Sequence, residues 1–120
     1  MEIERVGDIT VMAFEGDLDA VTLPTTASQV DDLIGTGDRR FVFNFHNVNL
    51  INSSTLGFLI KTRERLEEMD GALVLSEPAK VVHSAITTLG IDEVFNTFPS
   101  NAAAVDYLRQ QGGDSAAAPG

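Results

Sequence analysis

Hydroxyl and amide side chains gather in one stretch of the sequence, Leu50–Gly57. Within it, Asn52, Ser53, Ser54 and Thr55 stand where an apolar segment gives way to a helical pattern. Such side chains commonly satisfy the free N–H groups of the first helical turn. A phosphate on Ser53 would suit the same place, because free N–H groups and the positive end of a helix dipole favour an anion. The stretch therefore predicts a helix cap, and the chemistry that it could support is phosphorylation.

Other kinds of chemistry have little support. His46 and His83 stand far apart without cysteine partners, whereas a zinc site needs three or four converging ligands. A serine hydrolase needs a nucleophile, a base and an orienting acid, and Ser53 lacks the G-x-S-x-G surroundings of a nucleophile elbow. We expect no metal, no cofactor and no catalytic residue, and a small enzyme of an unrelated type is a less favoured alternative.

Length and composition limit the partners and compartments open to the chain. The 120 residues suffice for one domain, with 18 acidic against 8 basic side chains and a net charge of −10. This charge argues against binding to nucleic acid or to anionic membrane surfaces. The chain has no cysteine, no apolar run of the roughly 18 residues that span a membrane, and a charged N-terminus. We expect a cytoplasmic domain without direct membrane insertion.

The N-terminal segment has the pattern of a β-hairpin. Apolar residues favour strands over Ile3–Val6 and Ile9–Phe14, and Gly7-Asp8 between them has a composition typical of a two-residue turn. The two strands should therefore pair antiparallel. A loop is predicted to follow over Gly16–Asp19.

Helical and strand-like patterns alternate in the rest of the chain. Expected in order are a helix over Leu23–Ile34 with Thr22 as N-cap, a strand over Phe41–Phe45, a helix over Asn52–Met69, a strand over Ala72–Leu75, a helix over Ala79–Leu89, a short strand over Glu93–Phe95 and a helix over Asn101–Gln110.

The resulting order, β-β-α-β-α-β-α-β-α, is typical of an α/β fold. Alternating strands and helices imply βαβ units, a largely parallel sheet and right-handed crossovers. The hairpin makes the sheet mixed. Residues 1–111 are predicted to form the single domain, and 112–120, rich in Gly, Ala and Pro without periodicity, a disordered tail.

The strand over Phe41–Phe45 has little polar interruption and should be covered on both faces. Ser53 should begin the second long helix. Asp19 should lie near it, since both follow strands at one end of the sheet. The residues expected to be mostly buried are Phe41, Phe43, Phe45, Leu56, Leu59, Leu73 and Leu75.

Short motifs in the correct order resemble the STAS domain of the anti-sigma factor antagonist family. Glu15–Asp19 is similar to that family's G-[DE]-L-D, and Ile51–Gly57 is similar to its D-S-[ST]-G-L-G. The strand Gly71–Leu75 and, after a helix introduced by proline, the segment Leu89–Ile91 complete the resemblance. It extends over about Ile3–Gln110, nearly the whole domain.

The resemblance implies a non-enzymatic regulator that switches partners. An unphosphorylated member of the family binds an anti-sigma factor, often a serine kinase, and so releases a sigma factor. Phosphorylation ends that binding, and a serine phosphatase restores it. By position, Ser53 matches the phosphorylated serine, and Asp19, Asn52, Ser54 and Thr55 complete the expected partner-binding site.

Two residues depart from the family pattern. Asn52 stands where the family usually has Asp, so the capping oxygen is kept and the charge is lost. Thr55 stands where the family usually has Gly and adds bulk at the helix start. Some STAS domains are not phosphorylated and act as scaffolds or as subunits of transport complexes, and the neutral Asn52 favours that alternative.

Overall fold

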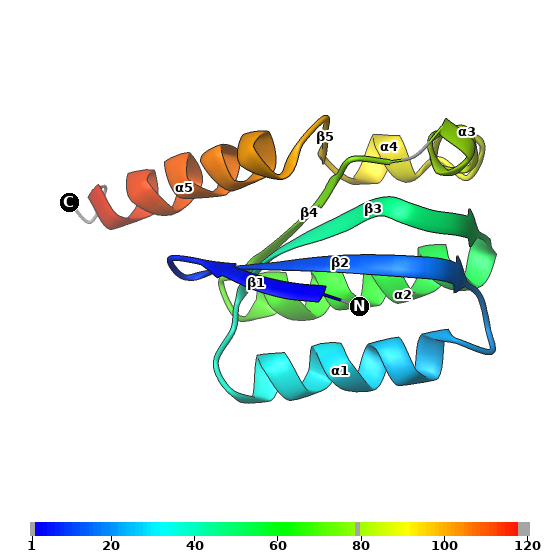
Figure 1. The fold of residues 1–120 in the computed structure, drawn as a ribbon. Coiled ribbons are helices and arrows are strands. Elements are labelled where there is room, and N and C mark those ends of the chain that lie inside the picture. The colour runs from blue at the N-terminus through cyan, green and yellow to red at the C-terminus, as the bar shows by residue number, and fades with distance from the viewer. Residues whose placement is uncertain (1, 79, 118–120) are drawn as a thin grey trace.

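The computed structural model describes residues 2–78 and 80–117 and shows a mixed five-stranded sheet with helices on both faces (Figure 1). The strand order is β1-β2-β3-β4-β5, with β1 antiparallel to β2 and the other neighbours parallel. This confirms the predicted α/β class. The elements are β1 (Glu2–Val6), β2 (Ile9–Leu18), α1 (Leu23–Gly35), β3 (Arg40–Ile51), α2 (Ser53–Glu68), β4 (Ala72–Ser76), α3 (Lys80–Thr88), α4 (Ile91–Val94), β5 (Thr97–Phe98) and α5 (Asn101–Ala117).

The predicted hairpin is confirmed. Val6 pairs with Ile9, so Gly7 and Asp8 form a two-residue turn between antiparallel strands. Gly7 has a φ of 64°, which a type II′ turn requires at its first central residue and which glycine adopts without strain.

Strands β2 and β3 are longer than the sequence pattern predicted. They remain paired through Leu18 and Ile51, so the predicted loop over Gly16–Asp19 is wrong up to Leu18. The pairing shifts register between Ala13 and Glu15 and again between Gly16 and Asp17. The extra residue at each shift lies in β3, where it breaks the alternation of apolar and polar residues. In β2 the alternation continues, but Gly16 and Asp17 are residue types typical of turns.

The segment before α5 differs from the prediction. Glu93–Phe95 was predicted as a strand, but it overlaps the short helix α4, and the last strand is β5. Asp92 and Glu93 lie in the first turn of α4, where negative charge favours a helix. The preceding α3 begins at Lys80, and Ala79, its predicted first residue, lies outside the described residues.

The C-terminal helix α5 continues past Gln110, its predicted last residue, to Ala117. The tail predicted at 112–120 thus overlaps this helix, and 118–120 lie outside the described residues. Disorder of the tail stays a prediction, as does the domain boundary after residue 111.

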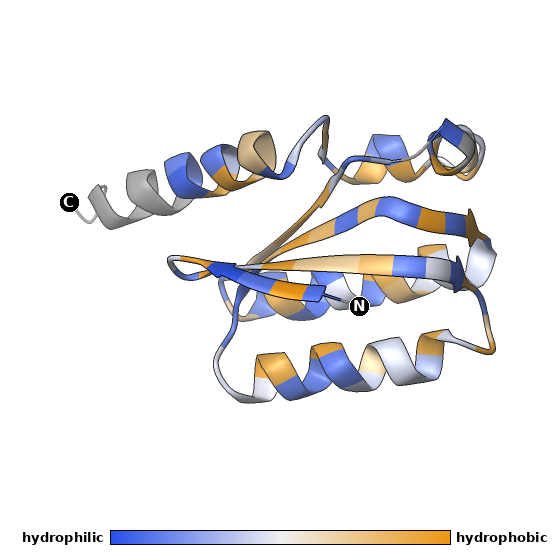
Figure 2. Ribbon diagram, in the orientation of Figure 1, coloured by the Kyte–Doolittle hydropathy of each residue, from blue (hydrophilic) through white to orange (hydrophobic). Residues whose placement is uncertain are grey.

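The sheet separates two apolar layers (Figure 2). The larger layer packs β2, β3 and β4 against α1, α2, α3 and α4, and the smaller one packs the opposite face against α5. Successive residues of β3 alternate between them, as with Phe43 in the larger layer and Val42 in the smaller. The predicted core residues are buried, except that Leu56 is only partly buried: Phe41, Phe43, Phe45, Leu59, Leu73 and Leu75.

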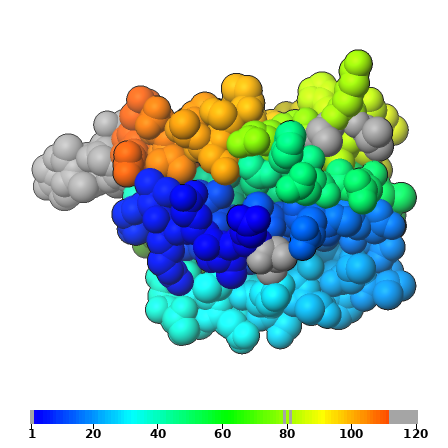
Figure 3. All heavy atoms as spheres, in the orientation of Figure 1, coloured from blue at the N-terminus to red at the C-terminus, as the bar shows by residue number. Residues whose placement is uncertain are grey.

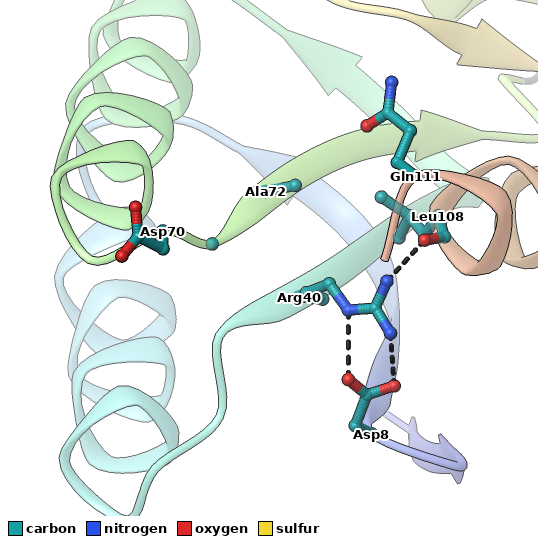
Figure 4. Close-up of a pocket in the computed structure, with 7 residues that line it drawn as sticks. Asp8, Arg40, Asp70, Ala72, Leu108 and Gln111 are labelled. Atoms are coloured by element: carbon teal, nitrogen blue, oxygen red, sulfur yellow. Dashed lines mark hydrogen bonds and ion pairs between the residues drawn. The ribbon is translucent and has the colours of Figure 1, made fainter. Parts of the chain in front are cut away.

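A charged clamp closes the end of the sheet where β3 begins (Figure 4). The Arg40 guanidinium donates from Nη2 to Asp8 Oδ1 at 2.5 Å and from Nε to Asp8 Oδ2 at 3.1 Å. Its Nη1 also donates to the carbonyl oxygen of Leu108. One side chain thus ties the hairpin turn to β3 and α5. These hydrogen bonds from Arg40 hold the pKa of Asp8 below its ordinary value.

The clamp predicts a pH-dependent effect of Asp8→Asn. The lowered pKa means that the carboxylate stabilises the fold above its unfolded-state pKa, and that this contribution is lost as pH falls through the folded-state pKa. Since Asp8 is largely exposed, we expect the substitution to lower the free energy of unfolding by only about 0.2–1 kcal/mol at pH 7. Urea titrations at several pH values should show the difference shrinking on acidification, and a constant difference would contradict the clamp.

Candidate functional site

The carboxyl ends of β2 and β3 bring the predicted site residues together. Leu18 and Ile51 are partners in the parallel pairing of the two strands. Asp19 and Asn52 are the next residues of each strand, so they leave the same end of the sheet side by side. The segments around residues 20 and 50 accordingly meet on the right-hand surface in Figure 3. The expected neighbourhood of Asp19 and the start of α2 is therefore present.

Asn52 is the N-cap of α2. Its backbone is extended, with φ −143° and ψ −167°, and its Oδ1 accepts hydrogen bonds from the backbone N–H groups of Ser54 and Thr55, at 3.0 and 3.4 Å. Two of the N–H groups that the sequence left free for an anion are thus already occupied. The cap is a neutral amide, so it satisfies these donors without adding a negative charge to the positive end of the helix.

Thr55 completes the capping box. Its Oγ1 accepts a hydrogen bond from the backbone N–H of Asn52 at 3.1 Å and donates one to the carbonyl oxygen of Leu18 at 2.5 Å. The residue is 0% exposed. Its hydroxyl therefore fixes the start of α2 to the end of β2. A direct contact of Thr55 with a partner stays a prediction.

Asp19 organises the turn that leads into α1. Its Oδ1 accepts from the backbone N–H groups of Val21 and Thr22, at 2.9 and 3.1 Å. Thr22 occupies the N-cap position of α1, as predicted, but its side chain does not cap the helix. Instead its Oγ1 donates to the carbonyl oxygen of Asp17 at 2.7 Å. The turn is thus held by side chains at both of its ends.

Ser53 and Ser54 are the first two residues of α2, and both are exposed. Asp19 is partly exposed beside them. Neither serine hydroxyl is needed for the cap, because the capping oxygen belongs to Asn52. The site therefore offers two adjacent exposed hydroxyls at the strand end that Asp19 also follows.

The two histidines lie elsewhere on the surface. His46 is exposed on β3 and His83 is exposed on α3. Among residues 2–78 and 80–117, no group of three or more His, Asp or Glu side chains is arranged to hold a metal ion. In the same part of the chain, no helix combines the length and apolar character needed to cross a membrane.

A family model describing the STAS domain matches residues 1–104. The chain belongs to the STAS domain family. All four segments that carried the resemblance fall within the match. The structure places two of them, Glu15–Asp19 and Ile51–Gly57, at the two adjacent strand ends described above. A comparison with curated proteins gives no match.

Solved structures of anti-sigma factor antagonists share this STAS fold. One from Mycobacterium paratuberculosis is 20% identical, with a TM-score of 0.80, over 90% of this chain and 92% of that chain. SpoIIAA in its unphosphorylated form is 21% identical, with a TM-score of 0.77, over 91% and 96%. The phosphorylated form of Bacillus SpoIIAA is 20% identical, with a TM-score of 0.68, over 90% and 98%. At these identities the likeness is one of fold.

Sequence reasoning missed two apolar residues beside the site. Val21, in the turn after β2, and Leu50, near the end of β3, are both exposed. The sequence pattern assigns Leu50 to the apolar segment before the helix, and the bulges in β3 concealed which face of the sheet it occupies. A valine within a polar turn, Ala-Val-Thr, was the available signal for Val21.

Proposed function

We propose that this STAS domain is an anti-sigma factor antagonist of the cytoplasm. In its unphosphorylated form it binds an anti-sigma factor that is also a serine kinase. The kinase transfers the γ-phosphoryl group of ATP to Ser53 Oγ, with release of ADP, and the modified protein no longer binds. A serine phosphatase restores the first state. The observation that carries this proposal is the exposed Ser53 at the first position of α2, beside Asp19, in a STAS domain.

The fold is compatible with such a modification. SpoIIAA, whose fold this chain shares, has been solved in both its unphosphorylated and its phosphorylated form. In the present chain Ser53 is not the cap of α2, so a phosphate on its hydroxyl leaves the hydrogen bonds of Asn52 and Thr55 in place. The phosphate would change the surface and spare the fold.

The departure at Asn52 has a physical consequence for this proposal. A capping carboxylate would already offset the positive end of the α2 dipole and would repel a neighbouring phosphate. The amide of Asn52 makes the capping hydrogen bonds without that charge. A phosphate on Ser53 is therefore more stable beside Asn52 than it would be beside an aspartate. A kinase that recognises a carboxylate at position 52 would nevertheless phosphorylate this chain slowly.

A kinase assay tests the proposed site. The purified protein is incubated with the purified serine-kinase anti-sigma factor of the same organism, ATP and Mg²⁺, and is followed by intact mass and fragmentation. We expect one phosphate in the wild type and in Ser54→Ala, and none in Ser53→Ala. Asn52→Asp should be phosphorylated faster if the kinase reads a carboxylate there.

Two outcomes would contradict the proposal. If phosphate is still incorporated in Ser53→Ala but not in Ser54→Ala, the modified residue is Ser54 and not Ser53. No phosphate on either the wild type or Asn52→Asp would favour an unphosphorylated STAS scaffold or a subunit of a transport complex.

A further inference from the structure

Strand β1 is an open edge of the sheet (Figure 1). Within the described residues it pairs with β2 alone, and its residues Glu2–Arg5 are exposed. The opposite edge is β5, which has only the two half-buried residues Thr97 and Phe98. An exposed edge strand carries unpaired backbone N–H and C=O groups, which can pair with a strand of another protein. The longer of the two edges is therefore the one that is open to such pairing.

The register of the hairpin decides which backbone groups of β1 point outward. Val6 and Ile9 flank the two-residue turn, and the pair that flanks such a turn exchanges hydrogen bonds across the hairpin. Bonded and non-bonded pairs then alternate along the two strands. The N–H and C=O groups of Ile3 and Arg5 are therefore directed away from β2, toward the position that an added strand would occupy.

A groove lies beside β1 on the face of the sheet that α5 covers. Two adjoining hollows of about 270 and 180 Å³ form it, and both are lined by Glu4, Val11 and Asn101. On the surface shown in Figure 3, the N-terminal residues and α5 lie side by side. We call this feature the β1 groove. Its other lining residues are Glu2, Ile3, Val6 and Ala13 from the hairpin and Ala102, Val105, Asp106 and Arg109 from α5.

The exposed charges of the β1 groove are mostly negative. They are Glu2, Glu4 and Asp106 against Arg109. None of the ion pairs within residues 2–78 and 80–117 involves one of these three carboxylates. Opposite charges on neighbouring strands stabilise their pairing, and complementary charge also speeds the approach of a partner. The groove therefore favours a strand that carries Lys or Arg.

A second copy of the chain would fit this edge poorly. Two β1 strands related by a twofold axis would pair antiparallel around one central residue. Pairing centred on Ile3 sets Glu2 opposite Glu4. Pairing centred on Glu4 or on Arg5 sets that residue opposite its own copy. Because like charges directly opposite one another destabilise a sheet, the charge pattern favours a strand from another protein.

We propose that β1 accepts an antiparallel strand from a basic protein partner. The backbone of the added strand pairs with the outer edge of β1, and two of its Lys or Arg side chains lie opposite Glu4 and Glu2. The residue between those two points to the other face of the sheet and meets Ile3, which is 47% exposed. The added strand therefore alternates basic and apolar residues.

This surface is separate from the candidate phosphorylation site. Strand β1 pairs with β2 only as far as Ala13, whereas Asp19 follows the far end of β2. The inference is therefore independent of the proposed function, and a second protein could hold the domain by β1 while the surface around Ser53 is free.

An NMR titration of the isotope-labelled protein with a capped peptide, Thr-Val-Thr-Lys-Val-Lys-Thr, tests the proposal. In antiparallel pairing the two lysines of the peptide oppose Glu4 and Glu2, and the valine between them opposes Ile3. We expect saturable shifts of the backbone amide signals of Ile3 and Arg5. The same peptide with Glu in place of both lysines should bind more than about tenfold more weakly, because like charges then face one another.

Matched variants separate the charge from the backbone pairing. Glu4→Lys should weaken binding of the basic peptide more than about tenfold. Glu68→Lys, at an exposed position of α2 on the opposite face of the sheet, should change it less than about twofold. Ile3→Pro removes an outward N–H, which an edge strand tolerates. It should bind the peptide about fivefold more weakly than Ile3→Ala, which keeps that donor.

Several results would overturn the proposal. One is the absence of saturable shifts at β1, and another is equal affinity for the basic and the acidic peptide, which needs no variant protein. Equal affinity of Ile3→Pro and Ile3→Ala would mean that the peptide does not extend the sheet. A concentration-dependent dimer that Ile3→Pro abolishes, seen by analytical ultracentrifugation, would make a second copy the occupant of the edge.

Discussion

Replacing Phe43 by alanine is expected to lower the free energy of unfolding by about 3–5 kcal/mol. The ring is completely buried on β3, the middle strand of the sheet. It lies edge-on to Phe14 at 4.8 Å between centroids and is stacked with Phe58 at 6.2 Å. Truncation would leave a cavity between the sheet and α2. A typical domain has only about 5–15 kcal/mol in total, so a urea titration should show a large shift of the midpoint.

A second variant separates lost volume from lost aromatic contact. Phe43→Leu retains most of the apolar volume and should cost less than about 1.5 kcal/mol. A loss below about 1 kcal/mol for Phe43→Ala would mean that this layer is not the main core. Equal losses for the two variants would mean that ring geometry, rather than filled volume, dominates.

Replacing Ser53 by aspartate is expected to weaken binding of the anti-sigma factor more than tenfold, about 1.4 kcal/mol or more. The added charge must lose water in the interface, and an unpaired charge there costs a few kcal/mol. The α2 dipole offsets about 0.3–1 kcal/mol of this, but it acts on free and bound protein alike. Calorimetric titration of the partner into each variant measures the effect.

Ser53→Ala is the matched neutral variant. Because Asn52 rather than Ser53 caps α2, alanine should leave both fold and affinity nearly unchanged while making the protein resistant to phosphorylation. Gln110→Glu, at an exposed position of α5 toward the other end of the sheet, controls for added negative charge. If Gln110→Glu weakens binding as much as Ser53→Asp, the effect is one of net charge and not of the site.

Local sequence rules, such as the spacing of apolar residues, were sufficient to predict the helices and strands that follow them. The helix beginning at Leu23, the buried strand around Phe43 and the hairpin at Gly7 were predictable because each follows one local rule. The extension of β2 to Leu18 was not, because Gly16 and Asp17 are residue types typical of turns, and the extension of β3 was not, because its bulges break the alternation. Nor was α4, whose four residues are too few for a helical period to emerge.

Sequence reasoning could predict which residues form the site, but not what each of them does there. The sequence brought Asp19 and Ser53 to one end of the sheet through the rule that parallel strands end together. The capping oxygen of Asn52 was expected, but the burial of Thr55 was not, because it depends on a hydrogen bond to the carbonyl oxygen of Leu18 across the end of β2. The exposure of Leu50 depends on where α5 packs, which no local pattern contains.

The most direct measurement compares the affinity of one preparation before and after phosphorylation. The purified protein is titrated with the anti-sigma factor, phosphorylated to completion at Ser53, titrated again, and titrated a third time after treatment with a serine phosphatase. The account predicts tight binding, then binding weakened more than tenfold, then recovery of the first value. Equal affinity in all three titrations, with phosphate confirmed on Ser53, would contradict it.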